Sequence, residues 1–130
     1  MVDTVAALML RAAAIDGAAC KALAAVPDMD DSVIGFHAQQ ACEKCLKGVL
    51  SAAGVDFSRT HDLVRLLDLL ASQGIEVPPE AQWIDELNPY AVEARYGMVE
   101  TSPLDRPRAL LAVDLLLAWA VQRLANPGAA

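Results

Sequence analysis

Apolar residues recur at intervals of three and four along most of this chain, and no segment shows sustained alternation of apolar and polar residues. Hydrophobic residues make up 55% of the chain but aromatic residues only 5%, so the core must consist mainly of Ala, Leu and Val. Ala and Leu lose little conformational entropy in a helix, whereas strands favour β-branched and aromatic residues. The chain is therefore predicted to be all-α.

Prolines, glycines and capping residues divide the chain into five predicted helices. The first should stop at Pro27, because the residue before a proline is pushed out of the α region. Gly54 and Gly74 suit left-handed positions at helix ends, and Thr60 can cap a helix start. The expected helices cover about residues 3–25, from 28–32 to 54, 60–74, 79–97 and 102–126.

Short connections between long amphipathic helices favour antiparallel neighbours. We therefore expect an up-and-down antiparallel bundle of four main helices plus one shorter helix. A length of 130 residues fits a single domain, residues 1–130.

The formal net charge of -7 argues against a grip on the phosphate backbone of long nucleic acid, although a local basic stripe could hold one small anion. The apolar run over residues 109–121 is shorter than the roughly 20 residues of a membrane span. Acidic and basic residues interrupt the apolar N-terminal stretch, which disfavours a signal peptide. A cytoplasmic protein without membrane contact is expected.

The three cysteines are an odd number in a chain without a secretory signal and are predicted to be reduced. Cys42 and Cys45 form a CxxC in the middle of a helix, without a second pair of ligands. Core packing is therefore favoured over metal or redox chemistry. Neither a metal nor a cofactor is expected.

The second predicted helix separates two faces when plotted at 100° per residue. One stripe carries an imidazole, an amide and two ammonium groups, which together could bind a phosphate. The alternative is a solvated face on which Glu43 neutralises a lysine. The stripe consists of His37, Gln40, Lys44 and Lys47. The core-facing arc consists of Ile34, Ala38, Ala41, Cys42, Cys45, Leu46, Val49 and Ala53.

Three further residues could join this patch. His61 lies beside Arg59 at a predicted helix start, where an anion can approach free amides, or it could simply bond a backbone group. Arg95 and Tyr96 offer a planar cation and an aromatic face for a phosphate and a base. Equally, Arg95 could serve a helix C-terminus and Tyr96 could pack with its hydroxyl in water.

Three segments together carry a family resemblance. They are FHAQQACEKCLKGVL at 36–50, THDL at 60–63 and NPYAVEARY at 88–96. With them the chain resembles the bacterial and archaeal HEPN domain (higher eukaryotes and prokaryotes nucleotide-binding). In the last segment Tyr90, Arg95 and Tyr96 match, but Gly97 stands where the family usually has proline.

The resemblance implies a compact helical bundle, often a homodimer, that binds a nucleotide or similar ligand. It also implies action with a small nucleotidyltransferase, in some cases as toxin and antitoxin. Other branches of the family are metal-independent ribonucleases with the motif R-x(4–6)-H. Neither His37 nor His61 has an arginine at the required distance. An imidazole without a positioned cation stabilises a cleaved phosphodiester poorly, so ribonuclease activity is disfavoured.

The leading hypothesis is therefore a non-catalytic, homodimeric module that binds a nucleotide-type anion through His37, Gln40, Lys44, Lys47, His61, Arg95 and Tyr96. The alternatives are a ribonuclease toxin with an atypical site and a purely structural adaptor. In the ribonuclease case, a dimer could pair Arg59 and His61 from two subunits.

Overall fold

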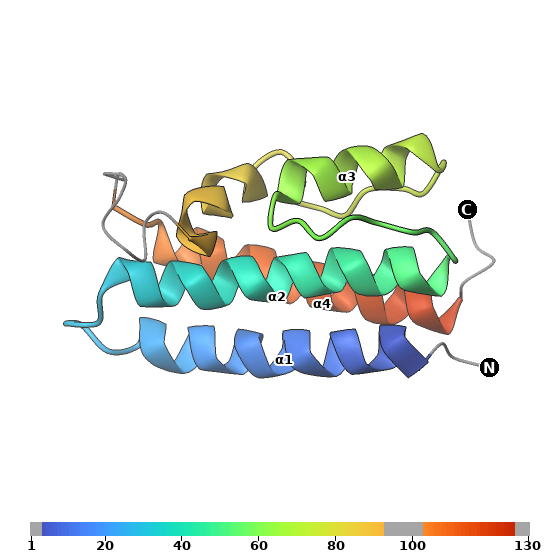
Figure 1. Cartoon of the computed structure of the whole chain (residues 1–130). Coiled ribbons are helices and arrows are strands. Elements are labelled where there is room, and N and C mark those ends of the chain that lie inside the picture. Colours follow the sequence, from blue (N-terminus) through green and yellow to red (C-terminus); the bar gives the residue numbers. More distant parts are fainter. Residues whose placement is uncertain (1–3, 93–102, 127–130) are drawn as a thin grey trace.

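The computed structural model describes residues 4–92 and 103–126. It contains four α-helices and one 3₁₀ helix, and no strand occurs in these two ranges (Figure 1). The elements are α1 (Thr4–Ala24), α2 (Asp31–Ala52), α3 (Leu63–Ser72), η1 (Ile84–Ala91) and α4 (Arg106–Ala125). The predicted all-α bundle of four main helices plus one shorter helix is confirmed. None of the described helices has the length and apolar character needed to cross a membrane.

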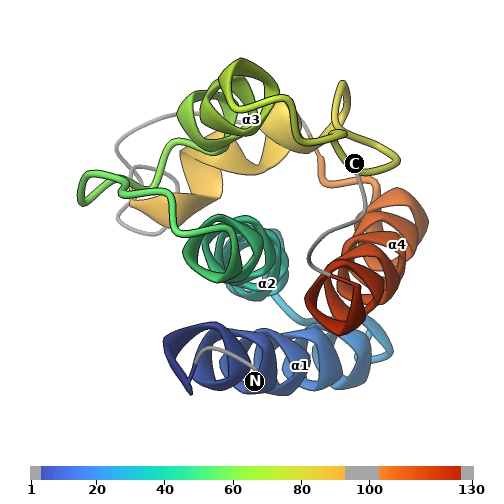
Figure 2. The same ribbon diagram turned by 90° about the vertical axis from the view of Figure 1, so that its right-hand side faces the viewer.

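Helix α2 lies at the centre of the bundle. Viewed along the helices in Figure 2, α1 lies below α2, α4 lies to its right, and α3 and η1 lie above it. Of its 22 residues 12 are buried, including two polar ones, Gln39 and Glu43. The polar side of this helix is therefore only partly open to solvent, because neighbouring segments also cover it.

Small residues allow α1 to approach α2 closely. A Cβ atom added at Gly48 would lie 2.7 Å from Cδ1 of Leu10, and Ala6 and Ala13 on the facing side of α1 are fully buried. Close approach of this kind brings the backbones together and strengthens dispersion contacts across the interface. It also brings the polar side chains of the two helices within hydrogen-bonding distance.

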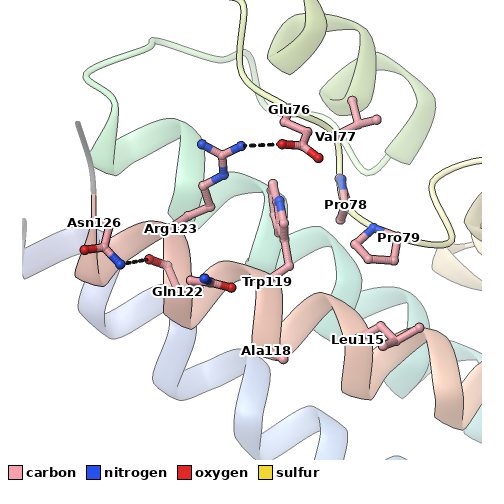
Figure 3. Close-up of a pocket in the computed structure, with 10 residues that line it drawn as sticks. All are labelled: Glu76, Val77, Pro78, Pro79, Leu115, Ala118, Trp119, Gln122, Arg123 and Asn126. Atoms are coloured by element: carbon pink, nitrogen blue, oxygen red, sulfur yellow. Dashed lines mark hydrogen bonds and ion pairs between the residues drawn. The ribbon is translucent and has the colours of Figure 1, made fainter. Parts of the chain in front are cut away.

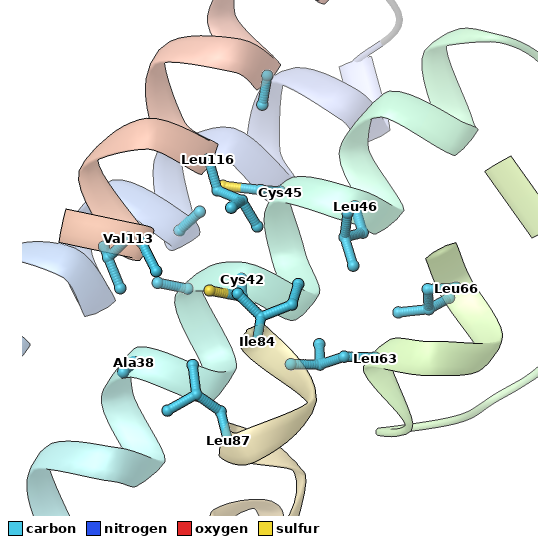
Figure 4. Close-up of a cluster of buried hydrophobic side chains, with 14 of the residues drawn as sticks. Ala38, Cys42, Cys45, Leu46, Leu63, Leu66, Ile84, Leu87, Val113 and Leu116 are labelled. Carbon is cyan, nitrogen blue, oxygen red and sulfur yellow. The ribbon is translucent and has the colours of Figure 1, made fainter. Parts of the chain in front are cut away.

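Figure 4 shows residues of α2 packed against residues of α3, η1 and α4, and buried residues of α1 belong to the same core. Cys42 and Cys45 lie among leucines and small residues from the other helices, and Cys20 of α1 is also buried and free. The prediction that the cysteines pack in the core is confirmed. Of the predicted arc on α2, only Ala53 is exposed, because it is the C-cap that follows the last helical residue.

Helix ends agree with the sequence where a cap is local. Asp30 caps α2, and Gly54 and Gly74 both adopt a left-handed φ of 72° after their helices. Thr60 is not the cap of α3; its hydroxyl accepts from the backbone N–H of Asp62, and Asp62 caps the helix through the N–H of Val64.

Two other helix starts differ from the prediction. The fourth element is a 3₁₀ helix that begins at Ile84 rather than an α-helix from Pro79, and Pro89 inside it cannot donate an α-helical hydrogen bond. Helix α4 begins at Arg106, capped by Asp105 through the N–H of Arg108, rather than at the Ser102-Pro103 pair. The end predicted at Gly97 lies outside the described residues.

Candidate functional site

Two buried carboxylates organise the polar residues of α2. Asp16 projects from α1 and Glu43 from α2 itself, and both are buried. A buried carboxylate is costly unless it is paired and hydrogen-bonded, so the partners of these two residues define the candidate site.

The Asp16 carboxylate holds two side chains of the predicted stripe. Its Oδ1 lies 3.0 Å from Nδ1 of His37, and its Oδ2 accepts from Nζ of Lys44. His37 and Lys44 are seven residues apart, so they stand two turns apart on the same side of α2. Phe36 packs edge-on against the His37 ring with centroids 5.4 Å apart. This Asp16 cluster fastens α1 to α2.

The Glu43 carboxylate collects three further donors. Its oxygens lie 2.8 Å from Nδ1 of His61, 3.1 Å from Nζ of Lys47 and 3.1 Å from Nε2 of Gln39. Gln39 also donates to the backbone oxygen of His61, at 2.8 Å, and its own Oε1 accepts from Gln40. His61 is thus held by both its ring and its backbone. Glu43, His61, Lys47 and Gln39 form the Glu43 cluster.

The pairing of Glu43 with His61 fixes the chemistry of the imidazole. An ionised carboxylate only accepts hydrogen bonds, so Nδ1 of His61 must carry the proton that it shares with Glu43. The opposite ring nitrogen, Nε2, is then a lone-pair acceptor in the neutral ring and a donor in the charged ring. The side chain of His61 is 61% exposed and that of Glu43 only 6%, so the imidazole edge is the part offered to a ligand.

The segment that carries His61 is anchored to η1 by one side chain. Asn88 accepts from the backbone N–H of Leu63 at 2.9 Å and donates to the carboxylate of Asp62 at 3.0 Å. Both bonds act at the start of α3, directly after His61. The register of α3 against η1 therefore sets the position of the histidine.

The charges of the two clusters balance. Asp16 and Glu43 carry two negative charges, and Lys44 and Lys47 carry two positive charges. Nζ of Lys47 also lies 5.9 Å from the centroid of the Phe57 ring. An anion that binds here must share lysines that already have carboxylate partners. Protonation of His37 or His61 would give the two clusters their first net positive charge.

A family model of the HEPN domain matches residues 8–124. The chain belongs to the HEPN family. The match covers all or most of each described helix and includes both carboxylate clusters of this HEPN domain. Neither the curated proteins nor the solved structures yield a match. Family membership supports a helical domain of nucleotide-binding or ribonuclease-like type.

The structure brings five of the seven predicted site residues of the HEPN domain into one band across α2. These five are His37, Gln40, Lys44, Lys47 and His61. The alternative in which Glu43 neutralises a lysine is confirmed for Lys47. Arg95 and Tyr96 lie outside the described residues, and their roles stay predictions.

Sequence reasoning missed three residues of this band. The sequence contains one indication of the role of Asp16: it stands at helical spacing from the buried Ala13 and Cys20, on an otherwise apolar face of α1. Gln39 belongs to the family motif, but its hydrogen bonds could not be read from spacing. Phe57 follows α2 in an irregular segment, where no periodicity predicts its neighbours.

The cysteines of the HEPN domain lie apart from this chemistry. Burial raises the pKa of Cys20 to about 11 and that of Cys45 to about 12. Burial also raises the pKa of Cys42 well above its ordinary value, with the neighbouring thiols adding to the shift. All three therefore stay as neutral thiols near pH 7 and are poor nucleophiles.

Proposed function

We propose that this HEPN domain is a non-catalytic module that binds a nucleotide or similar anionic ligand and acts with a small nucleotidyltransferase partner. A toxin–antitoxin pair is one setting for that partnership. The observation that carries the proposal is the Glu43 cluster, in which a buried carboxylate holds an exposed imidazole beside an ammonium group.

The cluster supports phosphate binding in a specific way. The charged ring of His61 offers a donor at Nε2, and Lys47 lies on the same carboxylate. An imidazolium and an ammonium group held on one carboxylate are both donors that suit the oxygens of a phosphate. The ring of Phe57, partly exposed next to Lys47, offers an apolar face for a base. Because Glu43 and Asp16 neutralise the lysines, we expect micromolar or weaker affinity.

The homodimer belongs to the same proposal, and its surface is suggested by α1 and α4. The outward side of α1 repeats apolar residues at alternating intervals of three and four, as in the seam of a coiled coil. The exposed side of α4 also repeats apolar residues at these intervals. The α1 residues are Val5, Leu8, Ala12, Ile15, Ala19 and Ala22, and the α4 residues are Leu111, Ala118, Val121 and Ala125. All but the partly buried Ala12 and Ala19 are exposed.

We place α1 of one copy against α4 of the other. Arg11 flanks the α1 seam and Asp114 interrupts the α4 seam, and both are exposed. Opposite charges on the two seams favour this pairing over α1 against α1, in which two Arg11 side chains would approach each other.

Isothermal titration calorimetry with ATP and GTP tests ligand binding. Wild-type protein should bind at least one of them saturably, and Lys47→Met should weaken binding about tenfold, which is about 1.4 kcal/mol. Lys21→Met removes an exposed lysine on α1 outside the band and should bind like wild type. Absence of saturable binding, or equal binding by Lys47→Met, contradicts the proposal; a dimer without affinity for nucleotides would favour the adaptor.

The Glu43–His61 pair also favours a second candidate, a ribonuclease with an atypical site. A carboxylate that orients an imidazole and leaves its outer nitrogen exposed is an arrangement used for proton transfer. This candidate predicts metal-independent RNA cleavage that His61→Ala abolishes while the helical content is unchanged. RNA that stays intact with highly purified protein would eliminate it.

A further inference from the structure

A pocket of about 700 Å³ lies between α4 and the segment that joins α3 to η1 (Figure 3). Its floor is the α4 surface around Trp119, and its opposite wall contains the adjacent prolines Pro78 and Pro79. Leu115 extends the apolar floor, while Arg123 and Glu76 stand at the other end. A volume of this size, mainly apolar with a few polar groups at one end, is typical of sites for small molecules.

The indole of Trp119 carries an unsatisfied donor in the wall of the pocket. Its Nε1 is buried, and within the described ranges it has no hydrogen-bond partner. Buried tryptophan N–H groups usually have one, and an orphaned donor costs about 1–3 kcal/mol. A ring rotation that turns this nitrogen toward the pocket would let a ligand oxygen accept from it and recover that cost.

Arg123 supplies a cation, and Glu76 is one of its partners. Its Nη2 lies 3.6 Å from a carboxylate oxygen of Glu76. The arginine side chain is 14% exposed and the glutamate side chain 78% exposed, so the cation lies in the wall and this one partner stands in solvent. A long ion pair with so exposed a partner contributes little. A ligand carboxylate could replace Glu76 and form two parallel bonds to the guanidinium.

We propose that this pocket binds a small planar aromatic carboxylate. The aromatic ring lies between the indole of Trp119 and the rigid proline pair, its carboxylate binds Arg123, and one oxygen accepts from the indole N–H. Arg123 provides one positive charge, which matches a monoanion. A triphosphate would be repelled more strongly, since the chain as a whole carries a net charge of -7. The site is separate from the band on α2 and does not depend on the proposed nucleotide binding.

Titration with 2-naphthoate, followed in ¹H–¹⁵N correlation spectra, tests the proposal. The chain has two tryptophans, so only two indole N–H signals occur, and Trp119→Phe identifies the relevant one. We expect the Trp119 signal to move saturably with a dissociation constant near or below about 1 mM, while the Trp83 signal moves less. 2-Naphthamide, which lacks the charge, should bind about tenfold more weakly.

Two variants decide the role of the charges. Arg123→Gln should weaken 2-naphthoate about tenfold and leave 2-naphthamide unchanged, whereas Glu76→Gln should strengthen 2-naphthoate by removing its competitor. Arg65→Gln, an exposed arginine on α3, is the matched control and should bind like wild type. Circular dichroism verifies that each variant is folded. No saturable shift of the Trp119 signal, or 2-naphthoate binding that neither Arg123→Gln nor Glu76→Gln changes, overturns the proposal.

Discussion

Replacement of Glu43 by glutamine should destabilise the fold more than any comparable loss of charge at the surface. The carboxylate accepts from His61, Lys47 and Gln39 and is 6% exposed. Glutamine has the same shape but only one accepting oxygen, and its NH₂ group would face a donor. Hydrogen bonds to a charged group are each worth about 1 kcal/mol more than neutral ones, so three of them amount to about 3 kcal/mol.

Thermal and urea denaturation measure this effect. With an unfolding entropy of about 2.1 cal/mol/K per residue, a loss of about 3 kcal/mol lowers the melting temperature by about 10 °C. The matched control is Glu76→Gln, whose carboxylate is 78% exposed and lies 3.6 Å from Arg123; it should change the free energy of unfolding by less than about 0.5 kcal/mol.

A double variant separates the effect of the lost hydrogen bonds from the effect of the unpaired ammonium group of Lys47. Lys47→Met added to Glu43→Gln removes the ammonium group that the first change leaves unpaired, so we expect the two changes to couple by about 1–2 kcal/mol. If the free energy of unfolding of Glu43→Gln lies within about 0.5 kcal/mol of the wild-type value, the carboxylate does not organise the Glu43 cluster and the reasoning fails.

Three further outcomes are expected. Gly35→Ala should lower the free energy of unfolding by about 1–3 kcal/mol in urea titrations, since its Cβ would lie 2.4 Å from the Tyr90 ring; a gain in stability would show that the contact is loose. Because the pKa values of Cys20 and Cys45 rise from 9.0 to about 11 and about 12, the unfolded chain loses these protons first, and stability should decline from pH 9 upward and stay level below it. In a Cys20→Ala, Cys45→Ala variant only the buried thiol of Cys42 remains, so the decline should be shallower, and an equally steep decline would contradict this. Ile15→Lys should convert a dimer to a monomer in sedimentation equilibrium while preserving the fold, and an unchanged mass would exclude the α1 seam.

Local signals in the sequence predict most of the fold. Apolar spacing and local caps located the helices, and the φ of 72° at Gly54 and Gly74 confirms the expected ends. The 3₁₀ helix was not predicted, because residues 79–91 have apolar spacing compatible with either helix type. The cap at Asp62 was missed because Asp62 and Thr60 are both good capping residues two positions apart.

Only part of the candidate site could be predicted from the sequence. Periodicity along α2 placed His37 and Lys44 on one side of the helix, which the structure confirms. Their shared partner Asp16 is 21 and 28 residues away, and only the packing of α1 on α2 brings it near. Periodicity describes a helix and not its neighbour, so a polar stripe that looks solvated can be a partly buried, ion-paired contact between two helices.

Long-range ¹H–¹⁵N spectra of the two imidazoles during titration with ATP test the central claim most directly. The chain has only His37 and His61, so each ring can be followed separately. Binding at the Glu43 cluster predicts that Nε2 of His61 shifts saturably while the His37 nitrogens move little, and that Lys47→Met moves the midpoint of the shift to an ATP concentration about tenfold higher. A His61 signal that ATP leaves unchanged beyond the effect of matched salt would contradict the account.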